Sequence, residues 1–339
     1  MKDYIFVGFG EVTCDIIYSN DLEIIYREPG GTTFNILSNI ARLSKDSRCY
    51  ALGIYGESED TNIILRKLRE SGINIDHLQK SNKKLNTFHC VIPNELQDVD
   101  LKTNKVINSI TYSRVSPING ETTYDRSMPI NQIIPRQLRN NDIIVVLENF
   151  RDGTIPFLKS IEKDRRIIIM DIGRITVFQH LSRDEILEVL HQVNMIQISE
   201  VVLEALKEKL EFQDVCELLE SCDLDIAILT KGKKGALIYY KDNVESKFVQ
   251  YNIIKPEEEI DPSGAGDAFL SIAAILYRYY LNRGINIDKK FADDVFLYGN
   301  SLARKVIRQI GARCSEETIK QWKKEEKSLI QQDKLEYQI

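Results

Sequence analysis

Hydrophobic positions along the chain gather in short runs that alternate with amphipathic segments of helical period. The runs are rich in Ile and Val, and several are apolar on both faces, which is typical of strands in a parallel sheet covered by helices. They span residues 4–7, 49–54, 143–147, 167–171, 195–198 and 226–229. The helical segments span residues 35–43, 61–71, 183–192, 201–210, 215–221, 264–281 and 289–310, with another from Ser315. This alternation predicts a doubly wound α/β fold.

Two segments interrupt the alternation, at about residues 16–29 and 86–129. Neither has a convincing helical pattern, and both read as added antiparallel strands. The second segment is longer than a connection needs, and long excursions often form lids or binding segments. The alternative interpretation is a surface flap without a role.

Composition places the chain among soluble globular proteins with a sizeable core. It has 339 residues, 43% of them hydrophobic, and a net charge of −6 from 45 basic and 51 acidic residues. We expect a single domain over residues 1–339, although the length would also allow two. The pI near 5.5 and the absence of a block of like charge argue against nucleic-acid binding.

Targeting and redox signals are also missing from the sequence. No stretch approaches the roughly 18 apolar residues that span a bilayer, and the apolar N-terminus is interrupted too early for a signal peptide. The six Cys residues are scattered without a C-x-x-C pair, so we expect reduced thiols. These signals favour a cytoplasmic protein that does not contact membranes.

The most informative motif is Asp261-Pro-Ser263-Gly264-Ala265-Gly266-Asp267, which precedes a long apolar helical segment. Glycines at a loop-to-helix junction let the backbone approach an anion, and the first helical N–H groups point at it. A carboxylate beside such an anion hole suits a general base in phosphoryl transfer. The alternative is a glycine-rich cap in which Asp267 only complements the helix dipole.

This motif closely resembles the C-terminal signature of the ribokinase-like (PfkB) carbohydrate and nucleoside kinase family. The resemblance implies a three-layer α/β/α sandwich with a small antiparallel β lid, and ATP-dependent phosphorylation of a hydroxyl on a sugar or sugar-like molecule. It assigns the anion hole to Gly264, Ala265 and Gly266 and the base to Asp267.

The N-terminal half carries two further motifs of the same family. Gly30-Gly31-Thr-Thr-Phe-Asn35 resembles the family's sugar-facing Gly-Gly-x-x-x-Asn pattern, and Asp15 resembles the aspartate that binds sugar hydroxyls. Gly8-Phe-Gly10 alone could indicate a dinucleotide fingerprint and hence an oxidoreductase, but Thr13 stands where the third glycine belongs.

The resemblance also implies a nucleotide site and metal sites. It assigns Thr230, Gly232, Gly235 and Asn300 to ATP. A monovalent cation such as K⁺ is expected at a set of residues from the two glycine-containing loops: Asp261, Ser263, Gly311 and Ser315. The family's magnesium-linked Asn-x-x-Glu reads Ser199-Glu200-Val201-Val202, and Gly-x-Asp-x-x-Gly reads Gly56-Glu-Ser58-Glu-Asp60-Thr61. Mg²⁺ is still expected because phosphoryl transfer needs charge neutralisation, with Glu200 contacting it through water.

Substrate and partners follow from the same resemblance. A neutral sugar is favoured over a sugar acid. An acidic or phosphorylated acceptor would need a cation in the sugar pocket, for which Arg114, Arg126, Arg151 and Arg174 are candidates, with Arg126 assigned to substrate binding. A nucleoside stays open because Phe88, Tyr112 and Tyr124 could stack a base. The lid segments are predicted to form a small antiparallel sheet over the sugar pocket, separate from the main sheet, which would limit ATP hydrolysis. A small sheet needs cover on its second face, and a homodimer through the lid would supply it. The alternative is that the long insertion caps its own sheet and leaves a monomer. Because the family motifs at residues 56–61 and 199–202 are altered in this sequence, a catalytically silent sugar-binding relative remains an alternative.

Overall fold

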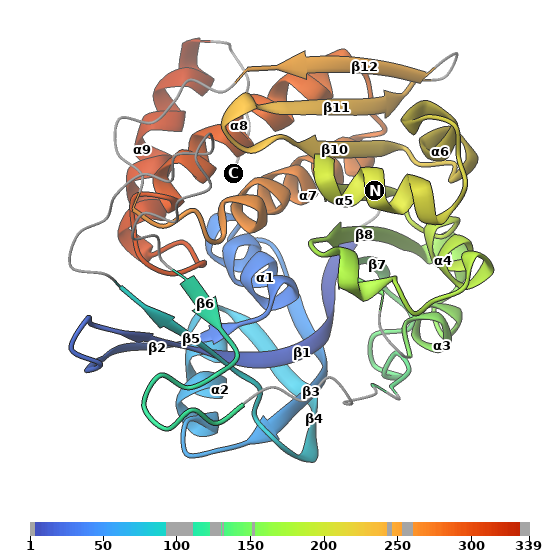
Figure 1. Ribbon diagram of the computed structural model, residues 1–339. Helices are drawn as coiled ribbons and strands as arrows, with labels where there is room; N and C mark the ends of the chain where they lie inside the picture. Colours follow the sequence, from blue (N-terminus) through green and yellow to red (C-terminus); the bar gives the residue numbers. More distant parts are fainter. Residues whose placement is uncertain are drawn as a thin grey trace.

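The structure is a computed structural model that describes residues 4–92, 111–122, 130, 132–150, 153–242, 246–252 and 260–332. A twisted sheet runs through the molecule between two layers of helices (Figure 1). The strands follow the order β12-β11-β10-β9-β8-β7-β1-β3-β4, and the neighbours from β10 to β4 are parallel. The strand bounds are β1 Tyr4–Tyr18, β3 Cys49–Glu57, β4 Ile73–Lys84, β7 Asp142–Glu148, β8 Arg166–Ile172, β9 Met195–Ser199, β10 Ile226–Thr230, β11 Ala236–Lys241 and β12 Ser246–Tyr251.

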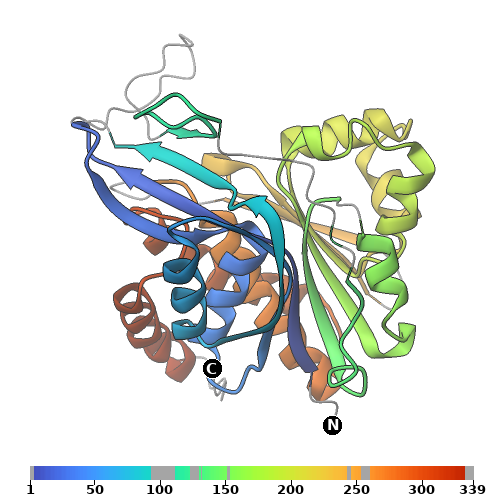
Figure 2. The ribbon, with the colours of Figure 1, turned by 90° about the horizontal axis from the view of Figure 1, so that it is seen from below.

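Figure 2 shows the two helical layers on opposite faces of the sheet. A separate hydrophobic cluster lies between each layer and the sheet. One layer holds α1 (Thr32–Leu43), α2 (Thr61–Glu70), α7 (Ala265–Arg283), α8 (Lys289–Val306) and α9 (Glu316–Gln332). The other holds α3 (Thr154–Lys159), α4 (Arg183–Leu190), α5 (Glu200–Lys209) and α6 (Val215–Ser221). Short 3₁₀ turns are η1 Lys163–Arg165, η2 Ile175–Val177 and η3 Gly232–Lys234.

Successive residues of the central strands enter opposite clusters. Ile144 and Val146 of β7 pack with α1 and α7, whereas Ile143 and Val145 pack with the helices of the other layer. Side chains of a strand alternate between faces, so burial on both faces requires the continuous apolar runs seen in the sequence. The predicted three-layer α/β/α fold with a mostly parallel sheet is confirmed.

The lid differs in detail from the prediction. The second half of β1 extends beyond the body and pairs antiparallel with β2 (Ile24–Gly30) and parallel with β5 (Thr87–Val91), which pairs antiparallel with β6 (Thr111–Ser113). The lid sheet is therefore mixed, and it is continuous with the main sheet through β1 rather than separate from it. The parallel pair arises because the chain passes from β4, which runs in the direction of β1, into β5 after two residues. Residues 93–110 and 123–129 of the predicted lid lie outside the described residues.

Three strands at the two ends of the main sheet, β4, β11 and β12, are absent from the sequence-based prediction. β4 lies at the edge of the main path and alternates buried Ile73 and Ile75 with exposed polar residues before it turns wholly polar. β11 and β12 form an antiparallel extension at the other edge. Within the described part of the chain, no helix has the length and apolar character needed to cross a membrane.

Gly8 and Gly10 lie inside β1 and not in a turn before a helix. A Cβ added at Gly8 would lie 2.2 Å from Cδ1 of Leu37, and one added at Gly10 would lie 3.1 Å from Oγ1 of Thr33. These glycines therefore allow α1 to pack closely on β1. The pair does not form the phosphate-binding turn that a dinucleotide site requires.

Candidate active site

The N-terminus of α7 is built around a glycine in the left-handed region. Gly264 caps the helix with φ 77°, and a Cβ added there would lie 1.9 Å from the carbonyl oxygen of Ala312. Only glycine meets both demands, because L-residues rarely adopt this φ and no side chain has room. The N–H groups of the first turn lack intrahelical acceptors and give this end a partial positive charge. The geometry thus suits binding of an anionic group at residues 264–266.

Asp267 lies in the first turn of the same helix and faces the start of α1. Nδ2 of Asn35 donates a hydrogen bond of 2.8 Å to Oδ2 of Asp267. Loss of solvation and then the negative charge of Asp171 raise the pKa of Asp267 well above its usual range, while the Asn35 hydrogen bond acts in the opposite direction. A carboxylate with a raised pKa is a stronger base, which suits removal of a proton from a hydroxyl.

Gln197 connects the end of the sheet to this helix terminus. Its Nε2 donates to Oδ1 of Asp171 at 3.0 Å and to the carbonyl oxygen of Gly266 at 3.1 Å. Loss of solvation raises the pKa of Asp171 to about 7, and Gln197 partly offsets this. Gln197 was not among the predicted site residues. The available signal was a polar side chain within the apolar run at 195–198.

The predicted acceptor residues come together where β1, β2 and α1 meet. Gly30 pairs with Thr13, and a Cβ added at Gly30 would lie 2.4 Å from Oδ1 of Asp15. Gly31 caps α1 with φ 94°, and a Cβ added there would lie 2.8 Å from the carbonyl oxygen of Glu11. The backbone of this turn therefore lies directly beside the Asp15 carboxylate, and Asn35 follows one turn later.

Several buried polar atoms have no hydrogen-bond partner among the described residues, and two of them belong to residues beside the predicted acceptor motif. These two are Oγ1 of Thr13 and Oδ1 of Asn35. Buried polar atoms almost always have a hydrogen-bond partner, so two atoms without one beside Asp15 and Asp267 indicate a place for a polar ligand. A polyol could satisfy these acceptors with its hydroxyl groups.

The carboxyl group of Asp15 gives a pH-dependent prediction. Loss of solvation raises its pKa to about 7, and Arg313 partly offsets this. An unfolded Asp titrates near a pKa of about 4, so the folded state binds the proton more tightly, and the free energy of unfolding falls as the pH rises from about 4 to about 7. We expect the free energy of unfolding of Asp15→Asn at pH 8 to be larger than that of wild type. Between pH 5 and pH 8, this free energy should fall less in Asp15→Asn than in wild type.

Urea denaturation at pH 5 and pH 8 measures this effect, with Asp21→Asn in the exposed turn before β2 as the control. An Asp15→Asn protein with the same pH dependence as wild type would contradict the raised pKa.

The two loops proposed to hold a monovalent cation are in contact. Asp261 is fully buried, and its carboxylate accepts hydrogen bonds from the N–H groups of Ser263 (2.9 Å) and Gly311 (3.0 Å). The structure therefore brings together three of the four predicted residues. Oγ of Ser315 instead accepts from the N–H of Thr318 at 3.0 Å and donates to Oγ1 of Thr318 at 2.8 Å, at the start of α9.

The predicted nucleotide residues lie on two elements. Asn300 of α8 lines a cavity of about 420 Å³ together with Asn252, Phe296, Arg304 and Gln321. The lining of this cavity does not include Thr230, Gly232 or Gly235, which lie at the end of β10 and in the following turn. Gly235 has φ 103°, and a Cβ there would lie 2.0 Å from the carbonyl oxygen of Tyr251, so this turn packs tightly against β12.

Two further predicted residues are Glu200 and Arg126. Glu200 is exposed, and a carboxylate oxygen lies 3.5 Å from Nζ of Lys231 in the predicted nucleotide turn. Arg126 lies outside the described residues. The described residues contain no group of three or more His, Cys, Asp or Glu residues that could hold a metal ion.

Comparisons with known proteins agree with the resemblance. A family model described as pfkB family carbohydrate kinase matches residues 160–319. The structure superposes on a ribokinase from Thermotoga maritima with a TM-score of 0.65 and 17% identity, covering 95% of this chain and 100% of that one. The chain therefore has the fold of ribokinase, and its resemblance to the PfkB family is confirmed.

Two curated relatives match a shorter segment. A nucleoside kinase from Methanocaldococcus jannaschii is 34% identical over 88 residues, which are 26% of this chain and 27% of the relative. A cytidine kinase from Thermococcus kodakarensis is 29% identical over 89 residues, 26% of this chain and 30% of the relative. The matched segments thus span less than a third of these relatives.

Proposed function

We propose that the protein is an ATP-dependent kinase that transfers the γ-phosphoryl group to a hydroxyl of a sugar or sugar-like small molecule. The observation that carries this proposal is the hydrogen bond between Asn35 and Asp267. This bond joins Asp267 at the start of α7 to Asn35 at the start of α1, from positions 232 residues apart. In this proposal the base, the anion-binding helix terminus and the polar acceptor pocket therefore meet at one point.

The chemistry follows from this arrangement. Asp15 and Asn35 orient the acceptor, and Asp267 takes the proton of the hydroxyl as its oxygen bonds to the γ-phosphorus. The bond to the oxygen that bridges the β- and γ-phosphates breaks, and ADP leaves. The amides of residues 264–266 stabilise the charge on the group in transfer. Thr230, Gly232, Gly235 and Asn300 hold the nucleotide in this proposal.

Mg²⁺ would supply charge neutralisation between the phosphates. Because the described residues contain no cluster able to cage a metal, we propose that it is bound mainly by the nucleotide and water, with Glu200 at most an indirect contact. We place a monovalent cation such as K⁺ where Asp261 joins Ser263 to the loop that begins at Gly311. Both carboxylate oxygens of Asp261 accept backbone N–H groups there, so backbone carbonyl oxygens would supply most of the cation's ligands. Its role would be to fix the loop that packs against Gly264.

A nucleoside is the second acceptor class that a specific observation favours. Phe88 of β5 is the register partner of Asp15, so both side chains lie on one face of the lid sheet. The guanidinium carbons of Arg114 and Arg174 lie 5.9 and 5.6 Å from the centre of the Phe88 ring. An aromatic ring next to the acceptor carboxylate could stack on a base, and the two curated relatives are named as nucleoside and cytidine kinases.

A turnover screen tests the proposal. Purified protein is incubated with ATP, Mg²⁺ and K⁺ and with D-ribose, D-fructose, a keto-deoxy sugar acid, adenosine or cytidine, and ADP release is measured. We expect acceptor-dependent ADP release with a neutral sugar or a nucleoside and none with the sugar acid. If no acceptor of a wider panel is phosphorylated but sugars still raise the melting temperature, the protein is the silent sugar-binding relative and the kinase proposal is wrong.

The lid surface supports the proposed homodimer. Four apolar side chains at the β1–β2 turn and on β2 are 36–47% exposed: Leu22, Ile24, Ile25 and Tyr26. A second copy of the chain would remove them from water, with a gain of about 25 cal/mol per Å². We expect light scattering to give twice the chain mass of 39.1 kDa and Ile25→Lys to give a monomer. A wild-type monomer at micromolar concentration would contradict the dimer.

A further inference from the structure

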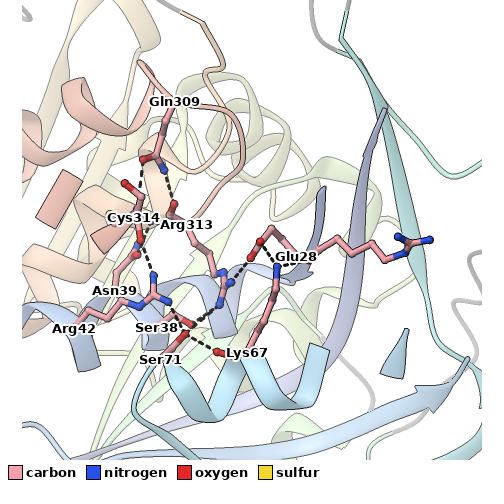
Figure 3. A network of polar contacts seen from close by, with 11 residues as sticks. Glu28, Ser38, Asn39, Arg42, Lys67, Ser71, Gln309, Arg313 and Cys314 are labelled. Carbon is pink, nitrogen blue, oxygen red and sulfur yellow. Dashed lines mark hydrogen bonds and ion pairs between the residues drawn. The ribbon is translucent and has the colours of Figure 1, made fainter. Parts of the chain in front are cut away.

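A partly buried ion pair connects the lid strand β2 to the loop between α8 and α9 (Figure 3). Nη2 of Arg313 pairs with Oε2 of Glu28, and Nη1 donates to Oγ of Ser71 at 3.2 Å. The other carboxylate oxygen of Glu28 pairs with Nζ of Lys67 from α2. The Arg313 side chain is 8% exposed and that of Glu28 is 30% exposed. Glu28 thus joins the lid to both the α2 helix and the 311–315 loop.

Each end of this pair adjoins one half of the proposed active site. Glu28 is the register partner of Asp15 and lies two residues before Gly30, which packs against the Asp15 carboxylate. Arg313 follows Ala312, whose carbonyl oxygen occupies the space beside Gly264. A side-chain contact of Glu28 with Arg313 therefore connects the acceptor strands to the loop that supports the anion-binding end of α7.

Apolar packing does not fill the space between these two elements. A cavity of about 420 Å³ lies there, and Asp15, Tyr26, Glu28 and Arg313 are among its lining residues. Across such a gap, β2 and the loop are joined by direct polar contacts rather than by close-packed side chains. The bonds of Arg42 to Ser71 (3.0 Å) and to the carbonyl oxygen of Cys314 (2.7 Å) hold the far side of the same loop.

We propose that Arg313 is a positioning residue that, through Glu28, couples acceptor binding at the lid to the anion-binding terminus of α7. This inference rests on the proposed kinase function. An acceptor that engages Asp15 and the Gly30–Gly31 turn fixes β2, and the ion pair then holds the 311–315 loop against Gly264. Nucleotide and acceptor consequently strengthen each other's binding, because such coupling is reciprocal.

Binding linkage tests the coupling. The affinity for a non-hydrolysable ATP analogue is measured by calorimetry with and without D-ribose or cytidine, whichever the wild type phosphorylates, in the presence of Mg²⁺ and K⁺. The variants are Glu28→Gln, Arg313→Gln and the double variant. Lys159→Gln is the control, because it removes an exposed ion pair (2.7 Å to Glu188) on the opposite helical layer.

We expect the acceptor to tighten nucleotide binding by a factor of about 5 or more in wild type and in Lys159→Gln, which is the usual range of such couplings. This gain in nucleotide affinity should fall to a factor of about 1 in both single variants, with no further loss in the double variant. In the same variants, the fold decrease in kcat should exceed the fold increase in the KM for ATP. Arg313→Lys should recover only part of the factor, because an ammonium cannot contact Glu28 and Ser71 with the planar fork. A folded Arg313→Gln protein that keeps the wild-type factor overturns the inference, since a merely structural role would lower the melting temperature without removing the linkage.

Hydrogen exchange tests the same coupling without any acceptor. The amides of residues 263–268 should exchange several-fold faster in Glu28→Gln than in wild type and in Lys159→Gln, although Glu28 lies on another element. Unchanged exchange there overturns the inference even if the protein is an active kinase. Conversely, a wild-type protein without turnover on any acceptor contradicts the proposed function, while the exchange experiment still decides the coupling.

Discussion

Asp267→Asn is expected to lower kcat by about 10²-fold or more, because a positioned general base commonly contributes a factor of that size. The substitution keeps the size of the side chain and its contact with Asn35, but the amide cannot take a proton from the acceptor. It also removes a partly buried charge that lies near Asp171. The melting temperature should therefore be equal to or above that of wild type, which separates a loss of chemistry from a loss of fold.

The measurement is steady-state ADP release at saturating ATP and acceptor, together with the affinity for ATP. Asp223→Asn is a matched control, because it makes the same chemical change on an aspartate whose side chain is 79% exposed and paired with Lys241. Its kcat should equal that of wild type. A near-wild-type kcat for Asp267→Asn would remove this residue from the role of base.

Gly264→Ala is expected to lower kcat by about 10²-fold or more, the effect typical of damage to a preorganised oxyanion-type site. The left-handed φ of 77° alone costs an L-residue about 1–2 kcal/mol. The added Cβ would also lie 1.9 Å from the carbonyl oxygen of Ala312, so the 311–315 loop or the helix terminus must move. Either movement displaces the amides from the group in transfer. The loss should appear in kcat, because the charge develops in the transition state.

Gly284 provides a matched control at the other end of the same helix. It has a similar left-handed φ of 64°, but nothing lies within 4 Å of the position its Cβ would take. Gly284→Ala should therefore lower stability without changing kcat. An effect of Gly264→Ala confined to the KM of the acceptor, or equal losses of kcat in the two variants, would contradict the assignment of Gly264 to the anion hole.

Predictions from sequence succeeded where the signal is local. The runs at 143–147 and 167–171 lie within the observed β7 and β8, since burial on both faces demands consecutive apolar residues. The junction at Gly264 could be placed because a glycine before a long apolar helical pattern marks a helix start. β4 was missed because an edge strand needs few apolar positions, and its exposed half is entirely polar. Gln197 was missed because a single polar residue in a strand does not show which group it will contact.

The sequence by itself therefore determined the layered α/β architecture, the helix that begins after Gly264 and the residue types of the proposed site. Only the tertiary structure decided that β5 pairs parallel with β1, that Asn35 bonds to Asp267, and that Glu28 meets Arg313 across 285 residues. Hydrophobic period and turn chemistry act over a few residues and can be read along the chain. Contacts between distant segments depend on strand order, pairing direction and the packing of helices on the sheet, and these are set only when the whole chain folds.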